Sequence, residues 1–263
     1  MTLKGNGPVF GFQKLTETQA DRLHHASLEI LERTGVRLFE PQALELLKHK
    51  GVKVEDGNRA RIPSDLVEWA LSVAPKQATL YDRHGGEAMV LEGYRTYYGT
   101  GSDCPNVIDP LTGEHRPGKL KDVVDATIVC DALPNIDFVM SFCIAHDLPP
   151  ITYDRHQMRA MLMNTTKPIL FVTMEFDGCV DAVRMAEAVA GGPDALRRSP
   201  LCACYINVSS PLRHNQEALQ KLLFMAEKGL PTTYTPVVLR GASGPVTAAG
   251  AIALANAGAL AGL

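Results

Sequence analysis

The feature that most constrains the fold is a regular alternation of short apolar segments with longer helical ones in the second half of the chain. Four strand candidates, at 137–142, 169–173, 201–207 and 232–237, begin 31 to 32 residues apart. A strand and a helix of that combined length form one unit of a parallel sheet with crossover helices. Eight such units make a typical barrel of about 250 residues. The spacing therefore predicts an α/β fold of the (βα)8 TIM-barrel type.

The chain holds enough residues for five of these units. A first strand is expected at 96–99, and the helices at 120–133, 154–164, 179–190, 215–228 and 246–263. Because the sequence stops inside the fifth helix, we expect only the N-terminal portion of the barrel, over residues 96–263. An open five-stranded sheet would expose an unpaired apolar edge. The alternative is a complete doubly wound sheet, against which stands the absence of a G-x-G-x-x-G motif after the first strand.

Residues 1–95 have a different pattern and predict a small helical region with a β-hairpin. A capping box at Thr16 and Gln19 begins a first helix that ends at Gly35. Proline marks the beginning of a second helix at Pro41 and of a third at Pro63. Short strands are expected at 78–81, 88–91 and 96–98. We therefore divide the chain into an N-terminal region, 1–95, and five barrel units, 96–263.

Composition excludes several classes of function. The net charge of −3 offers no basic surface for nucleic acid, and we expect none to bind. The N-terminus lacks the apolar core of a secretory signal, and the most apolar run, 246–263, is rich in Ala and Gly. We therefore expect a cytoplasmic protein without a membrane partner.

Six cysteines in such a chain predict reduced, mostly buried thiols rather than disulfides. Cys202 and Cys204 share one face of a predicted strand, but no second C-x-x-C or H-x₃₋₅-H motif accompanies them. We therefore predict no metal site.

The candidate site follows from the expected strand ends, because parallel barrels bind substrates at the carboxyl ends of their strands. The residues expected to contact substrate at these ends are Tyr97, Tyr98, Asp103, His146, Glu175, Tyr205, Asn207, Ser210 and Tyr234. No catalytic residue is assigned among them.

Aromatic rings and a few acids dominate this set, which favours a small cationic ligand, since an ammonium over a Tyr face gains about 0.5–2 kcal/mol. Other interpretations stay open. The aromatics are also suited to filling barrel layers, His146 to a structural role beside Asp147, and Glu175 to capping a helix. Gly241–Gly244 is a weak candidate for anion binding.

Short segments spread over the whole chain also carry a collinear pattern. They are residues 15–17 (LTE), 25–36 (HASLEILERTGV), 61–63 (RIP), 74–75 (AP), 81–83 (YDR), 133–138 (LPNIDF), 210–213 (SPLR) and 241–247 (GASGPVT). In this order they resemble the trimethylamine methyltransferase family.

The resemblance implies a TIM-barrel methyltransferase that moves a methyl group from a methylated amine to the Co(I) of a separate corrinoid protein. The substrate would be a quaternary amine such as glycine betaine, which is slightly favoured, or trimethylamine. Family members that contain pyrrolysine carry it beyond the region that this chain covers. We expect no cofactor bound in this chain, a corrinoid (cobalamin) on the partner protein, and a homo-oligomer.

Two other hypotheses remain. A TIM-barrel enzyme of another class, such as a lyase or aldolase, would usually place a lysine at a strand end or cluster carboxylates for a metal, whereas Lys167 precedes its strand. A non-catalytic relative would bind the small molecule without turning it over.

Overall fold

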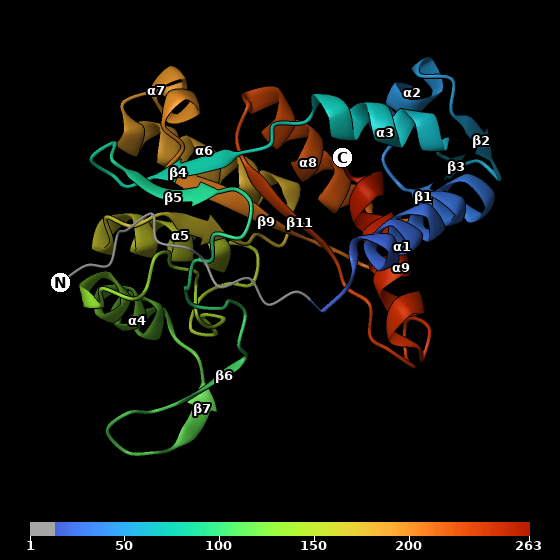
Figure 1. Cartoon of the computed structure of the whole chain (residues 1–263). Helices are drawn as coiled ribbons and strands as arrows, with labels where there is room; N and C mark the ends of the chain where they lie inside the picture. The colour runs from blue at the N-terminus through green and yellow to red at the C-terminus, as the bar shows by residue number, and fades with distance from the viewer. Residues whose placement is uncertain (1–13) are drawn as a thin grey trace. The chain divides into compact units, whose positions relative to one another are not determined.

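The protein, described by a computed structural model over residues 14–263, has a mixed α/β fold with several small sheets (Figure 1). These residues form two compact units. The first unit contains residues 77–205 and 225–232, and the second contains residues 14–76, 206–224 and 233–263. The boundary at residue 95, between an N-terminal region and barrel units, stays a prediction.

The three helices predicted near the N-terminus are confirmed in the second unit. α1 (Glu17–Glu29) begins with the capping box, in which Thr16 Oγ1 accepts from Gln19 N and Gln19 Oε1 accepts from Thr16 N. It continues as the π-helical turn η1 (Ile30–Thr34) and stops at Gly35, whose φ of 73° is in the left-handed region. α2 (Pro41–His49) and α3 (Ser64–Val73) follow at the two prolines.

A four-stranded sheet in the same unit was not predicted. Its order is β10-β1-β3-β2, and each strand is only two or three residues long. The strands are β1 (Val36–Leu38), β2 (Lys53–Glu55), β3 (Arg59–Arg61) and β10 (Arg213–His214). Leu31, Leu38 and Ala60, all at most 2% exposed, form the centre of its core. α9 (Ala248–Ala261) packs against α1, where Ser27 Oγ donates to Ala253 O.

A parallel sheet organises the first unit. β8 (Ile169–Phe171) pairs with β9 (Cys202–Val208), with Ile169 opposite Cys202, and the order continues to β11 (Thr232–Pro236). The strands predicted at 96–99 and 137–142 are present only as single parallel bridges, Gly99 with Phe138 and Val139 with Ile169. Neighbouring strands therefore lie in the order in which they occur in the chain. The described residues form no closed barrel.

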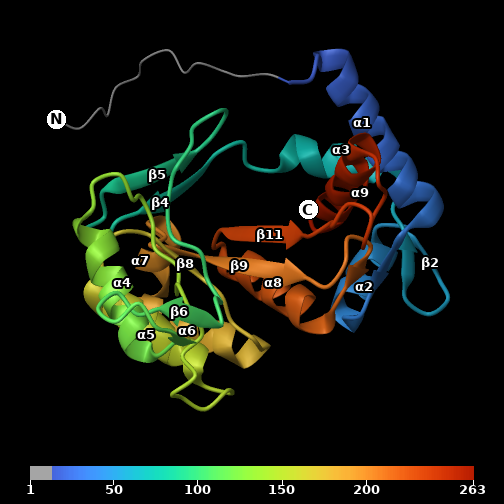
Figure 2. The same ribbon diagram turned by 90° about the horizontal axis from the view of Figure 1, so that it is seen from below.

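The predicted helices follow these strands. They are α4 (Leu120–Ala132), α5 (Tyr153–Asn164), α6 (Phe176–Ala190) and α8 (Gln216–Lys228), and a short α7 (Pro193–Arg198) was not predicted. α5 and α6 lie on one side of β8, and a hairpin of β4 (Ala78–Tyr81) and β5 (Glu87–Leu91) lies on the other (Figure 2). The hairpin packs its Leu80 and Met89 against Leu170 and Ala203 of the sheet.

A second hairpin, also not predicted, lies in the sequence between Gly99 and α4. Its strands are β6 (Asn106–Ile108) and β7 (His115–Pro117). Asp109 stabilises the turn, because its Oδ1 accepts from Leu111 N and Thr112 N. Three-residue strands carry too little alternation to stand out in a sequence.

Within residues 14–263, no helix has the length and apolarity that crossing a bilayer requires.

Candidate functional site

One face of the sheet in the first unit becomes more exposed toward the carboxyl ends of its strands. At the amino ends, the β4–β5 hairpin covers Leu170 and Ala203. Two residues further along, Val172 and Tyr205 are only half-buried, and Met174, beyond the end of β8, is 62% exposed. Side chains alternate along a strand, so Tyr205 lies on the face of β9 that carries the hairpin, while Val172 and Met174 follow Leu170 just beyond the end of β8. We call Val172, Met174 and Tyr205 the open face.

A buried phenol lies near two carboxylates at this end of the first unit. Tyr153, at the start of α5, is 7% exposed, and Asp154 beside it is 4% exposed. Burial first, and then the charges of Asp103 and Asp154, raise the pKa of Tyr153 to about 12. We call Asp103, Tyr153 and Asp154 the Tyr153 cluster. Its composition, a neutral phenol among carboxylates, favours a cation over an anion.

Asp154 also ties the loop after β8 to the start of α5. Its Oδ2 accepts from Met174 N at 3.2 Å, and its Oδ1 accepts from Arg155 N at 2.8 Å. A Cβ atom at Gly178 would lie 2.5 Å from Asp154 Oδ2, so the first turn of α6 needs glycine there. The strand-end loop that carries Glu175 is therefore held by a buried carboxylate.

Sequence reasoning missed Tyr153 and Asp154, because Asp154 was predicted only as the first residue of a helix and Tyr153 lies just before that predicted helix. The available signal was an aromatic ring and an acid at a helix start, three and four residues after Pro150.

The two predicted tyrosines at the first strand have different environments. The Tyr97 hydroxyl accepts from Val90 N at 2.9 Å and donates to Val90 O, and its ring packs on the cluster around Leu80. Tyr98 is 66% exposed, and its backbone N donates to Asp137 Oδ2. The phenol of Tyr97 thus already has backbone partners, while that of Tyr98 faces solvent.

Three other predicted residues of the first unit lie on strand-end loops. Asp103 is half-buried in the left-handed region, with φ 58°. His146 is exposed, and the neighbouring Asp147 accepts from Leu120 N through Oδ1 at the start of α4. Glu175 is exposed at the N-cap of α6, but its side chain makes no capping bond.

The remaining predicted residues belong to the second unit. Asn207, exposed on the same side of β9 as Tyr205, accepts from Thr235 Oγ1 at 3.3 Å. Ser210 accepts from Arg213 N in a turn. The Tyr234 hydroxyl lies 2.6 Å from Nδ1 of the buried His214. As substrate contacts, all nine residues stay predictions.

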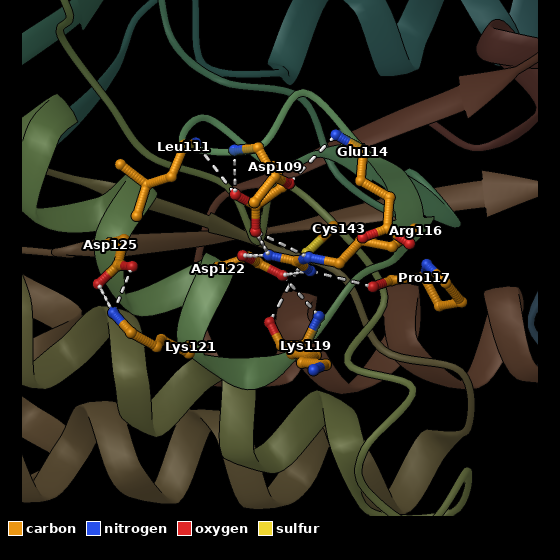
Figure 3. Close-up of polar contacts among 11 residues, drawn as sticks. Asp109, Leu111, Glu114, Arg116, Pro117, Lys119, Lys121, Asp122, Asp125 and Cys143 are labelled. Atoms are coloured by element: carbon orange, nitrogen blue, oxygen red, sulfur yellow. Dashed lines mark hydrogen bonds and ion pairs between the residues drawn. The ribbon is translucent and has the colours of Figure 1, made fainter.

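An arginine between two carboxylates anchors the β6–β7 hairpin to α4 (Figure 3). Arg116 donates to Asp109 Oδ2 at 3.0 Å and to both oxygens of Asp122, the closer at 2.7 Å. The guanidinium of Arg116 lowers the pKa of Asp122, and backbone N–H donors together with Arg116 lower that of Asp109. A groove of about 600 Å³ beside this network is lined in part by the exposed Ile108 and Leu111.

We expect Arg116→Gln to release the hairpin from α4, because a neutral amide cannot bridge two carboxylates. Hydrogen–deuterium exchange should become at least several-fold faster across residues 106–117 than in the parent protein. Arg184→Gln, which removes an exposed arginine 3.7 Å from Asp181, is the matched control and should leave this segment unchanged. Equal exchange in both variants would mean that Arg116 does not hold the hairpin.

The six cysteines are free thiols, and all except Cys104 are buried, as the sequence predicted. Cys202 and Cys204 lie on the helix-covered side of β9, and Cys204 Sγ is 3.9 Å from Cys179 Sγ. Within the described part of the chain, no three His, Cys, Asp or Glu side chains gather as metal ligands. The Gly241–Gly244 loop is closed by its own bonds, since Leu239 N donates to Ser243 Oγ.

Comparison with known proteins decides the family. The family description "Trimethylamine methyltransferase (MTTB)" matches residues 6–263. The chain belongs to the trimethylamine methyltransferase family. The resemblance seen in the short segments is thereby confirmed.

Relatives within the trimethylamine methyltransferase family carry two kinds of name. The chain is 30% identical to Trimethylamine methyltransferase MttB of Desulfitobacterium hafniense (strain DSM 10664 / DCB-2), over 94% of this chain and 50% of that protein. It is 28% identical to Glycine betaine methyltransferase of Desulfitobacterium hafniense (strain Y51), over 95% and 52%. It is 27% identical to Trimethylamine methyltransferase MttB of Methanosarcina barkeri, over 98% and 55%. The chain thus spans about half the length of the relatives that it matches.

Proposed function

We propose that this chain is part of a methyltransferase that takes a methyl group from a methylated amine and passes it to a separate corrinoid protein. The observation that carries the proposal is the family match over residues 6–263, with relatives named for trimethylamine and for glycine betaine. A quaternary amine such as glycine betaine is the favoured substrate, and trimethylamine is the second candidate.

The open face and the Tyr153 cluster support binding of a cationic amine. Tyr205 offers a half-buried ring within β9, three residues before the strand ends, and Met174 offers an exposed thioether beyond β8. Asp103 supplies a negative charge that is only half-buried, so a cation can approach it. A methylated ammonium gains from both kinds of group, because its charge is spread over methyl groups that also prefer an apolar contact.

The residues of this chain would bind and orient the amine. A corrinoid on the partner protein would supply the Co(I) nucleophile that accepts the methyl group. A quaternary ammonium then leaves as a neutral tertiary amine, so the enzyme needs to supply orientation and little acid catalysis. The corrinoid is assigned to a partner protein.

The order of the strands supports a TIM-barrel half as the finer description of the fold. The segments around Gly99 and Val139, then β8, β9 and β11, are neighbours in chain order. A doubly wound sheet reverses direction at a switch point, whereas a barrel adds each unit on the same side. We therefore keep residues 96–263 as five barrel units. The cytoplasmic location and the homo-oligomer expected from the sequence are separate parts of the proposal.

Lys167 is poorly placed to act as the Schiff-base lysine of an aldolase, which was one of the alternatives. Lys167 Nζ donates to Cys130 O and Leu133 O, each at 2.7 Å, and so caps the end of α4. An amine that satisfies two helix carbonyls is poorly placed as a nucleophile.

Amine binding is expected to depend on Tyr205 and Asp103. Titration calorimetry with glycine betaine, carnitine and trimethylamine should show binding of at least one of them. Tyr205→Ala and Asp103→Asn should each weaken that binding by about 3- to 30-fold, the range expected when one ring or charge contact is lost. Tyr94→Ala, at a tyrosine 77% exposed, and Asp125→Asn, at a carboxylate paired with Lys121, are the matched controls and should bind as the parent does.

Methyl transfer is tested by incubating the protein with amine and reduced cobalamin and following methylcobalamin by its absorbance. Binding without transfer would assign the chain to the non-catalytic alternative. Absence of both binding and transfer, for all three amines, would refute the proposed substrate class.

A further inference from the structure

Two cysteines lie directly opposite each other, beyond the segments that pair at Gly99 and Phe138. Cys104 and Cys143 form a parallel bridge, in which Cys104 N donates to Phe142 O and Ile144 N donates to Cys104 O. The residue before each cysteine, Asp103 with φ 58° and Phe142 with φ 63°, is in the left-handed region. Both strand segments therefore bend at the same level and regain pairing at the cysteines.

This register suits a disulfide. Adjacent strands lie about 4.8 Å apart, and disulfide-bonded residues usually have Cα atoms about 4.4–6.8 Å apart. Partners in a parallel bridge also direct their side chains to the same face of the sheet. The two sulfur atoms thus need rotation about side-chain bonds, rather than a shift of strands, to meet.

The two thiols differ in access. Cys104 is exposed, whereas Cys143 is fully buried. The Gly118 backbone covers Cys143, because a Cβ atom there would lie 2.7 Å from Cys143 Sγ. Burial raises the pKa of Cys143 to about 11, so its thiolate is scarce at neutral pH. An external oxidant therefore reaches Cys104 first.

We propose that Cys104 and Cys143 form a redox-modification site that reacts with low-molecular-weight disulfides. The Cys104 thiolate attacks one sulfur of a disulfide such as oxidised glutathione, forms a mixed disulfide and releases one thiolate. The Cys143 thiol then gives its proton to solvent and attacks the Cys104 sulfur, which releases the second external thiol. Two cysteines are oxidised, and one external disulfide is reduced to two thiols.

The cross-link would join the loops that carry Asp103 and His146, two residues of the predicted substrate site. Their backbones would lose freedom at the strand ends, where the proposed amine site lies. The redox site itself does not depend on the proposed function.

Peptide mapping tests the link. The reduced protein is incubated with oxidised glutathione under native conditions, alkylated and digested with trypsin. Cleavage yields segment 96–119, whose one cysteine is Cys104, and segment 122–155, which holds Cys130 and Cys143. We expect these segments to be joined, with fragmentation placing the bond at Cys143 and the free-thiol count falling from six to four.

Three variants sharpen the result. Cys130→Ser, at a buried cysteine of α4, should still form the link, whereas Cys143→Ser should stop at the glutathione adduct on Cys104. If Cys143→Ser does not fold, Cys104→Ser gives an independent test, because it should lose both adduct and link while its circular dichroism spectrum stays that of the parent. A glutathione adduct on Cys104 alone in the parent protein, or a bond to Cys130, would overturn the proposal.

Discussion

Lowering the pH from 7 to 4 is expected to cost the protein about 3 kcal/mol of stability through a single buried histidine, His214. This residue is fully buried in the second unit, and burial lowers its pKa to about 4. Its ring lies between two partners, with Nδ1 2.6 Å from the Tyr234 hydroxyl and Nε2 3.2 Å from Pro211 O. Pro211 O can only accept, so Nε2 carries the proton and Nδ1 accepts from Tyr234.

The sign of the effect follows from this arrangement. An exposed histidine has a pKa of about 6.5, as in the unfolded chain. Between pH 6.5 and 4, His214 is therefore protonated in the unfolded chain but neutral in the folded protein. Stability is therefore complete above pH 6.5 and falls as the pH drops toward 4. Burial also raises the pKa of Tyr234, so its hydroxyl stays protonated and keeps donating over this range.

Urea unfolding between pH 7 and 4 measures the effect. Carboxylates also contribute to acid sensitivity, so the decisive quantity is the difference between variants. His214→Gln should lose most of the extra slope between pH 6.5 and 4, although it starts from a lower stability. His156→Gln, at an exposed histidine, should keep the parent's slope. Parallel slopes for His214→Gln and the parent would show that His214 titrates normally.

The second large effect is expected from Gly258→Ala, which should destabilise the protein by about 1–3 kcal/mol. In an ordinary helix interior this change stabilises by up to about 1 kcal/mol. Gly258 lies in α9, however, where an added Cβ atom would be 2.4 Å from Pro211 O and 2.9 Å from Pro236 Cβ. A backbone oxygen cannot rotate away as a flexible side chain can, so the helix or the strand-end segment must shift.

Thermal unfolding with paired variants tests this prediction. Ala259→Gly, one residue along and exposed, measures the helix propensity term alone and should cost only about 1 kcal/mol. Gly101→Ala, where no atom lies within 4 Å of the added Cβ, should leave stability close to that of the parent. A Gly258→Ala protein as stable as the parent would mean that α9 moves freely away from Pro211.

The helices were predictable because their signals are local. The capping box at Thr16, the prolines at Pro41 and Pro63 and the long apolar periods each depend on residues within a few turns. The strands expected at 96–99 and 137–142 were only partly predictable, since pairing there is limited to single bridges, and the segments after them contain Asp103 and Phe142 in the left-handed region. A left-handed conformation at a residue other than glycine has no reliable sequence signature.

Some features of the predicted site were also predictable from the sequence, and others were not. Strand alternation places Tyr205, within β9, on the open face, as the sequence suggested for a ligand-facing residue. The partners of Tyr97 and Tyr234 were not predictable, because Val90 and His214 reach them through tertiary packing. Tyr153 gains its altered pKa from burial and from Asp103, fifty residues earlier in the chain.

The amino-acid order alone was enough to determine the alternation of strands and helices, the family and the ends of the long helices, since these properties depend on residues that are contiguous in the sequence. Which side chains remain free for a ligand was decided only by the tertiary structure. A phenol or an imidazole bonds whichever group the fold brings within 3 Å, and burial then sets its proton affinity. Distance and desolvation of this kind arise from residues far apart in the chain, so no local pattern records them.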